Sequence, residues 1–206
     1  VEATGEVLIG SARVGVSVRG QILVSGALAR LRRDHPRLVP RVRVVEPAQV
    51  PTLLRQGALD VAFVPVPISG DDLELLALTA MQSVLLCPAE HPLADAVAVG
   101  PEALAEAAFV APAPLLGVPG DGWPPGVARR VALYLDDPVH AAALAAEEGL
   151  LVVVPAALAP LPGMAVVDLA IPATPMHAVR RVAVSQSQDL AGLVIDAVEG
   201  ALRLDA

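Results

Sequence analysis

Residues 42–64, with the sequence VRVVEPAQVPTLLRQGALDVAFV, contain a complete strand–helix–strand pattern and decide the fold class. The alternation of Val and Arg in residues 42–46 predicts a strand, and the apolar run Leu59–Val64 predicts a second one. Between them, residues 47–49 turn into a short helix that buries Val50, Leu53 and Leu54 and ends at Gly57. We therefore expect two parallel strands with the helix packed on the sheet.

The residues before this pattern extend it towards the amino end. Residues 7–12 form a short apolar run that predicts another strand, and the polar residues 13–21 predict a loop. A helix follows, with Val24, Ala27, Leu28 and Leu31 on one face, and it must end before Pro36. The order β-α-β-α-β predicts an α/β fold with parallel strands and helices on the faces of the sheet.

The second half of the chain repeats this organisation. The long apolar stretch 73–88 predicts two strands in line, or one strand that crosses between two lobes. Asp137 and Pro138 predict a helix start, and this helix ends at Gly149. We expect the other elements of this block to be a helix from Pro101, strands at 108–111, 131–135 and 150–154, and a loop rich in Pro and Gly at 113–126.

The last elements indicate how the two blocks are connected. Strands are predicted at 166–169 and 179–184, and a helix near Asp189 places Leu193 and Ala197 on its apolar face. Because this helix has no partner in the second block, we expect it to return to the first. The fold is thus predicted as two Rossmann-like lobes joined by two crossovers, residues 1–79 with 170–206, and residues 80–169. Such folds bind small ligands in a cleft lined by strand carboxyl ends.

Composition and charge exclude several classes of function. Apolar residues make up 55% of the chain and charged residues 17%, which predicts a folded domain with a large core. The net charge of −8 argues against binding of nucleic acid or of an anionic membrane by this chain alone.

The one cysteine, Cys87, excludes an internal disulfide and favours a reducing compartment. No apolar run is long enough to span a bilayer, no secretory leader is visible, and we expect a fragment of a longer protein.

Several strings, in this order and spacing, resemble one family over nearly the whole chain. They are GEVLIG at 5–10, LRRDHP at 31–36, QGALDVAF at 56–63, HPLA at 91–94 and EGLLVVVP at 148–155. The chain is similar to the effector-binding domain of LysR-type transcriptional regulators. The most specific feature is the Gly-x-Leu-Asp-x-Ala strand entry followed about thirty residues later by His-Pro-Leu-Ala.

The resemblance implies a type 2 periplasmic-binding-protein fold that binds a small effector, in a cytoplasmic protein. It also implies a side-by-side homodimer, for which residues 22–34 supply a surface, and a larger homo-oligomer at full length. DNA would be bound only by a separate N-terminal winged helix-turn-helix, which this chain lacks. The chain departs from the family pattern near Val24-Ser25, where a Leu-Pro pair is usual, and at 117–126, where a helix is expected.

Few residues are candidates for chemistry. The four histidines have no partner at metal-ligand spacing, and Cys87 lies in an apolar strand, so we expect no metal, no cofactor and no catalysis. Asp137 is interpreted first as a helix cap and second as a ligand contact. The pairs Arg129-Arg130 and Arg180-Arg181 are interpreted as solvated charges.

The predicted ligand contacts lie where the predicted strands end. They are Ser11, Ala12, Arg13, Ala48, Val64, Pro65, Ala111 and Pro112. Two interpretations of Arg13 stay open: a cation of a surface loop, or the anchor of an anionic ligand. Because most of these residues are small and apolar, we expect a compact ligand with one carboxylate rather than a sugar. The alternatives are a free-standing solute-binding protein that serves a transporter, and an enzyme on the same fold.

Overall fold

The computed structural model describes residues 11–97, 99–114, 119–124, 126–182 and 190–202. The chain forms two compact units, the first made of Val1–Thr79 with Pro175–Ala206 and the second of Ala80–Thr174. The chain therefore passes between the units twice, and residues 170–174 belong to the second unit. Among the described helices, none is both long and apolar enough to cross a membrane.

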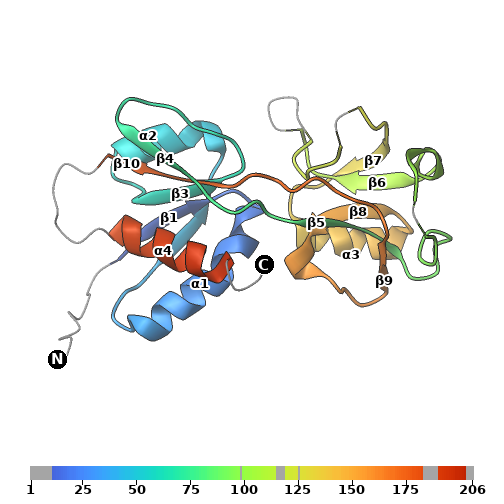
Figure 1. Cartoon of the computed structure of the whole chain (residues 1–206), viewed down its shortest axis with the longest axis horizontal. Coiled ribbons are helices and arrows are strands. Elements are labelled where there is room, and N and C mark those ends of the chain that lie inside the picture. Colours follow the sequence, from blue (N-terminus) through green and yellow to red (C-terminus); the bar gives the residue numbers. More distant parts are fainter. Residues whose placement is uncertain (1–10, 98, 115–118, 125, 183–189, 203–206) are drawn as a thin grey trace. The chain divides into compact units, whose positions relative to one another are not determined.

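The first unit is built on a five-stranded sheet in the order β2-β1-β3-β10-β4 (Figure 1). Its strands are β1 Arg13–Val16, β2 Arg41–Val44, β3 Val61–Val64, β4 Leu73–Ala77 and β10 His177–Arg181. The helices are α1 Gly20–Asp34, α2 Val50–Arg55, preceded by the 3-10 turn η1 Pro47–Gln49, and α4 Leu190–Leu202. β1 pairs in parallel with β2 and β3, whereas β10 runs antiparallel to β3 and β4. The parallel β-α-β-α-β block is thus confirmed.

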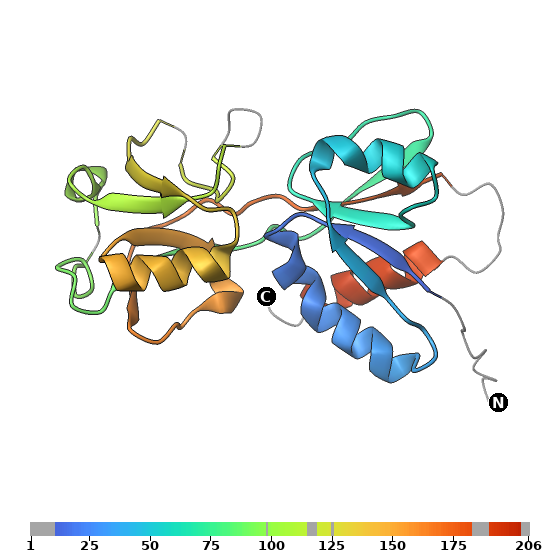
Figure 2. The same cartoon turned by 180° about the vertical axis from the view of Figure 1, so that it is seen from behind.

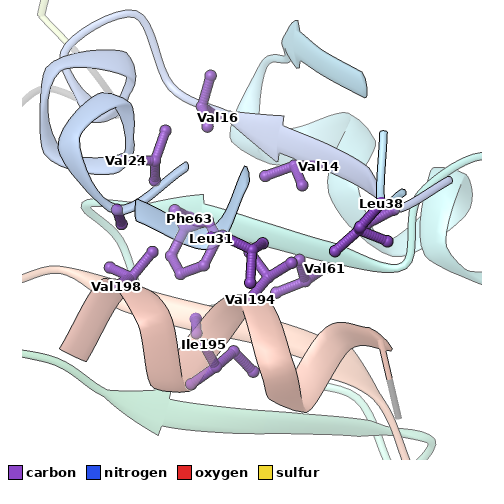
Figure 3. Packing of buried hydrophobic residues seen from close by; sticks show 13 residues of the cluster. Val14, Val16, Val24, Leu31, Leu38, Val61, Phe63, Val194, Ile195 and Val198 are labelled. Carbon is purple, nitrogen blue, oxygen red and sulfur yellow. The ribbon is translucent and has the colours of Figure 1, made fainter. Parts of the chain in front are cut away.

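Helices α1 and α4 cover one face of this sheet, where they lie side by side (Figure 2). Figure 3 shows Val24 and Leu31 of α1 and Val194 and Val198 of α4 directed at Phe63 of β3. Leu193 and Ala197 also pack against this cluster. The prediction that the last helix returns to the first block is therefore confirmed, because its apolar face is buried there.

Helix α2 covers the opposite face of the first sheet. Val50 and Leu54 of α2 are fully buried and pack with Ala62 and Val64 of β3. Alternation along β3 places Phe63 towards α1 and α4, and its two neighbours towards α2. This central strand is buried on both faces, which explains its unbroken apolar sequence.

The second unit contains a five-stranded sheet in the order β7-β6-β8-β5-β9. Its strands are β5 Ser83–Pro88, β6 Ala108–Ala111, β7 Arg130–Tyr134, β8 Leu151–Pro155 and β9 Met164–Val167. It has one described α-helix, α3 Pro138–Glu148, and the 3-10 turns η2 Pro101–Leu104 and η3 Ala156–Leu158. The expected helix from Pro101 is thus only a single 3-10 turn.

Helix α3 begins and ends at the residues that the sequence predicts. The carboxylate of Asp137 accepts hydrogen bonds from the backbone N–H groups of Val139 and His140, both at 2.9 Å. Gly149 closes the helix in the left-handed conformation, with φ of 70°. The cap interpretation of Asp137 is confirmed, and the alanines of α3 pack against Val110 and Val152 of the sheet.

The apolar stretch 73–88 contains two strands that belong to different sheets, β4 and β5. The backbone N–H and C=O groups of Met81 pair with those of Thr174 where the chain enters and leaves the second unit. The strand predicted at residues 7–12 can be compared with the structure only at Ser11 and Ala12, and there the prediction is wrong. Ser11 and Ala12 lie outside any strand, β1 starts at Arg13, and residues 7–10 lie outside the described residues.

Candidate functional site

The later start of β1 changes which residues lie at the ligand-binding edge of the first sheet. Parallel strands of an α/β sheet bind ligands beyond their carboxyl ends. Ser11, Ala12 and Arg13 lie at the amino end of β1, which is the opposite edge. Ala12 is fully buried in the core. The placement of these three residues beside Ala48, Val64 and Pro65 is therefore wrong.

Arg13 is held by neighbours at that amino edge. Its Nη2 lies 2.5 Å from Oδ1 of Asp60, its Nε donates to Oδ2 of Asp60 at 3.1 Å, and its Nη1 donates to the carbonyl oxygen of Gly57. The hydrogen bond to Asp60 raises the pKa of the Arg13 guanidinium. Arg13 links the amino end of β1 to the amino end of β3 and does not reach the carboxyl edge of the sheet. This position favours the interpretation of Arg13 as a surface cation.

The carboxyl end of β1 leads directly into helix α1, and the sequence interpretation missed these residues. Ser17 donates its backbone N–H to the carbonyl oxygen of Phe63, and its Oγ accepts from the N–H of Gly20 at 3.1 Å. A Cβ at Gly20 would lie 3.2 Å from the same Phe63 oxygen, so only glycine fits without displacement. The spacing of Val14, Val16 and Val18 is the period-two signal that indicates this strand.

Arg19, which precedes the helix, is buried, with 7% of its surface exposed. It occupies the N-cap position of α1, whose first turn contains no acidic residue. The edge is completed by Ala48 in η1 after β2, by Val64 and Pro65 at the end of β3, and by His177. His177 pairs with Val64 and Ala77, and its Nδ1 is buried without a hydrogen-bond partner. The first unit thus brings Ala48, Val64 and Pro65 to one edge, together with a buried cation.

The carboxyl edge of the second sheet contains Ala111 and Pro112, as predicted from the end of β6. Ala111 is fully buried, and Pro112 is half-buried. Oδ1 of Asp136, which follows β7, accepts from the backbone N–H of Ala113 at 2.9 Å. Asp136 therefore ties the loop after β6 to the loop after β7.

The interpretation of Arg129 as a solvated charge is wrong. Its Nη1 lies 2.6 Å from Oδ2 of Asp121, whose side chain is fully buried, and only 9% of the Arg129 side chain is exposed. The guanidinium also lies 5.0 Å from the ring of Trp123 and 5.8 Å from that of Phe109. Arg180 is likewise paired, since its Nε lies 2.7 Å from Oε2 of Glu74. These arginines support the fold.

No group of three or more His, Cys, Asp or Glu side chains that could hold a metal is found among the described residues. Cys87 is buried in β5, and burial raises the pKa of its thiol. The thiolate, which is the reactive form, is thereby disfavoured.

Comparisons with known proteins give the family. The sequence matches the family model described as LysR substrate binding domain over residues 5–203. No curated protein matches the chain.

Solved structures show the same fold. A mutant of OxyR from Corynebacterium glutamicum has a TM-score of 0.75 at 17% identity, covering 98% of this chain and 66% of that chain. HinK, a LysR family regulator from Pseudomonas aeruginosa, has a TM-score of 0.76 at 17% identity, covering 99% of this chain and 73% of that one.

A third structure is the BenM effector binding domain with its effector benzoate. It has a TM-score of 0.72 at 18% identity and covers 95% of this chain and 93% of that chain. The two-sheet α/β architecture is that of the periplasmic-binding-protein-like regulatory domains. Such domains bind effectors rather than catalyse reactions. The chain belongs to the LysR substrate-binding domain family, and it is an effector-sensing regulatory domain of that family.

Proposed function

We propose that the carboxyl edge of the first sheet binds a compact effector with one anionic end. The observation that carries this proposal is the position of Arg19, a buried cation at the start of α1. The dipole of α1 favours an anion near the amino end of the helix, and no acidic side chain in the first turn of α1 opposes this.

The other residues of this edge support the same class of ligand. Ala48, Val64 and Pro65 offer no side-chain hydrogen-bond donor or acceptor. A sugar buried here would leave hydroxyl groups unpaired, at about 1–3 kcal/mol each. A small aromatic or aliphatic carboxylate would be held by Arg19 at one end and by apolar contacts at the other. Benzoate, the effector in the BenM structure, belongs to this class.

A thermal-shift screen tests the proposal. Small carboxylic acids, with benzoate among them, are compared with sugars and amines of similar size. A ligand at about 100 times its Kd stabilises the protein by about 2.7 kcal/mol, which raises Tm by roughly 5–10 °C for a chain of this size. Stabilisation by sugars or amines, with none by any carboxylate, would contradict the proposed class.

Two arginine variants locate the anchor. We expect Arg19→Gln to weaken carboxylate binding about tenfold or more, because a hydrogen bond to a charged group contributes about 1.5–3 kcal/mol. Arg13→Gln is the matched control, since Arg13 lies at the amino end of β1 and pairs with Asp60. Isothermal titration measures both. Equal affinity of Arg19→Gln and wild type would remove Arg19 from the site.

We further propose that Ala111 and Pro112 are the ligand-binding residues of the second unit. We also propose that the chain acts by binding rather than catalysis, in a cytoplasmic regulator. DNA would be bound by a separate N-terminal domain, because a net charge of −8 disfavours binding to phosphates. A gel shift at about 150 mM salt tests this. We expect no retardation of duplex DNA by residues 1–206, and sequence-specific retardation would contradict the proposal.

We also propose that the chain forms a homodimer through α1 and the edge strand β2. Six of its 14 basic residues lie within residues 30–43, and all six are exposed. They are Arg30, Arg32, Arg33, Arg37, Arg41 and Arg43. Val42 and Val44 of β2 are 43% and 45% exposed. Because the rest of the chain is strongly acidic, this basic and apolar surface would pack against an acidic surface elsewhere on the second copy rather than against its own counterpart.

Light scattering of two matched variants tests this surface. Val44→Glu places a charge on β2, and Val166→Glu places one on β9, an edge strand of the second sheet, where Val166 is 49% exposed. We expect wild type and Val166→Glu to have twice the monomer mass of 21.0 kDa, and Val44→Glu to dissociate. A monomeric wild type at high concentration would contradict the dimer.

A further inference from the structure

Three consecutive residues of the second unit, Gly120, Asp121 and Gly122, touch three different parts of that unit. A Cβ at Gly120 would lie 3.3 Å from the carbonyl oxygen of Ala113 and 3.5 Å from Cγ of Pro112. A Cβ at Gly122 would lie 2.9 Å from the carbonyl oxygen of Pro172 and 2.9 Å from Oγ1 of Thr174. The segment thus joins the edge at Pro112 to the residues where the chain leaves the second unit.

The backbone at both glycines lies so close to its neighbours that a side chain would not fit without displacing them. Real side chains almost never come as near as the Gly122 contacts would require, and the Gly120 contact is tighter than most. Gly122 also has φ of 80°, which side-chain-bearing residues rarely adopt. A shift of Pro112 or of Thr174 towards the segment would therefore press on its backbone.

Asp121 anchors the middle of the segment. Its buried carboxylate binds Nη1 of Arg129 at 2.6 Å and Nη2 at 3.1 Å, and it accepts from the backbone N–H of Trp123 at 3.2 Å. The guanidinium of Arg129 lies over the rings of Trp123 and Phe109, at 5.0 and 5.8 Å from their centres. Phe109 belongs to β6, the strand that ends at Ala111. Removal of the Arg129 guanidinium would leave the buried carboxylate of Asp121 unpaired, so this pair anchors the segment.

We propose that Asp121 and Arg129 are positioning residues that make Gly120–Gly122 a strap between the Pro112–Ala113 edge and the second crossover at Thr174. A ligand at that edge then changes the backbone at Thr174 through the strap. The effect of a ligand on Thr174 rests on the proposed function. The mechanical link between Pro112–Ala113 and Thr174 does not.

Two glycine variants test the link without a ligand. Gly122 and Gly126 have φ of 80° and 81°, but a Cβ at Gly126 would meet no atom within 4 Å. Gly122→Ala and Gly126→Ala therefore share the backbone strain and differ in the contact with Thr174.

Amide hydrogen exchange measures the effect at the far end of the strap. The N–H of Ala113 is bonded to Asp136 and does not touch Gly122. We expect this amide to exchange about tenfold faster in Gly122→Ala than in Gly126→Ala, because local opening requires less free energy. Equal exchange of Ala113 in the two variants would overturn the strap.

Arg129→Lys gives a second measurement if Gly122→Ala fails to fold. It keeps the positive charge next to Asp121 but removes the two-pronged hydrogen bond. We expect faster exchange of the Ala113 amide here as well. Unchanged exchange in a folded Arg129→Lys protein would overturn the positioning role.

The fluorescence of Trp123 tests whether a bound ligand acts on the strap. Trp123 is the only tryptophan of the sequence, and its ring packs on Arg129. With benzoate as the probe, we expect its emission to change with the same Kd as the thermal shift. Stabilisation by benzoate without a change in emission would overturn the ligand step and leave the proposed function intact. If no carboxylate stabilises the protein, the proposed function fails, and the glycine variants still decide whether the strap exists.

Discussion

The pairs Arg13–Asp60 and Arg129–Asp121 join the same chemical groups at similar distances, 2.5 Å and 2.6 Å, in different surroundings. Arg13 is 47% exposed and Asp60 20%, so water and salt screen their attraction. Arg129 is 9% exposed and Asp121 not at all. In the buried pair each charge depends on the other for its stability, whereas in the exposed pair each can be solvated alone. The comparison shows that burial, and not charge, decides which pair the fold depends on.

The largest effect is expected from Arg129→Met. This change keeps most of the side-chain length but leaves the carboxylate of Asp121 buried without its cation. Removal of one partner of a buried pair destabilises a protein by about 3–5 kcal/mol. Urea denaturation measures the free energy of unfolding, and a loss below about 1 kcal/mol, as at surface pairs, would break the comparison.

The double variant Asp121→Leu with Arg129→Met separates the pair from its packing. Apolar replacement of both partners removes the unpaired charge, and such replacements are often neutral or stabilising. We expect the double variant to be more stable than Arg129→Met alone by about 2 kcal/mol or more. If the double variant is the less stable of the two, the loss comes from packing around Trp123 rather than from the charge.

Asp137 is a carboxylate whose exposure is closer to that of the Arg13–Asp60 pair than to that of the buried pair Arg129–Asp121, and its partners are backbone N–H groups. Its side chain is 42% exposed and accepts two backbone N–H groups at the start of α3. We expect Asp137→Ala to reduce the free energy of unfolding by about 1 kcal/mol. Asp137→Asn, which keeps an accepting oxygen, serves as the control and should retain most of that stability. Equal losses in the two variants would show that the cap does not stabilise α3.

Arg13→Gln is expected to change the free energy of unfolding by only about 0–1 kcal/mol, since exposed pairs contribute little. High salt should reduce even this difference, because it screens exposed charges. Chemical denaturation at low and high salt checks both statements. A loss as large as that of Arg129→Met would show that exposure does not distinguish the two pairs.

The smallest effect concerns the surface pair Arg55–Asp72, whose side chains are each 49% exposed. The hydrogen bond from Arg55, the largest cause, lowers the pKa of Asp72 below its ordinary value of 3.8. The stabilisation is present above that ordinary value and is lost as the pH falls through the lower pKa of the folded state. An NMR titration of Asp72 should show its pKa rising towards 3.8 in Arg55→Gln. An unchanged pKa would show that the pair is absent in solution.

The sequence predicted those elements whose signals are local. Asp137 and Gly149 bound α3 because a capping carboxylate and a left-handed glycine act within one turn. The strand Val61–Val64 and helix α4 were predicted because a buried face leaves a regular apolar pattern. The start of β1 was misplaced because residues 7–12 are as apolar as a strand, whereas the parallel partners that define β1 lie far along the chain.

Of the candidate site, the sequence determined the apolar ends of β3 and β6, Val64, Pro65, Ala111 and Pro112, because a strand end can be located from its own residues. It also determined the α/β class and two lobes, since periodicity and loop length limit the possible topologies. The positions of three arginines depend on contacts between distant parts of the chain: Arg13 lies at the amino edge, Arg19 lies at the carboxyl edge, and Arg129 is buried against Asp121. An arginine has the same sequence signature in water and in a core, and its surroundings come from residues that the chain brings together only when it folds.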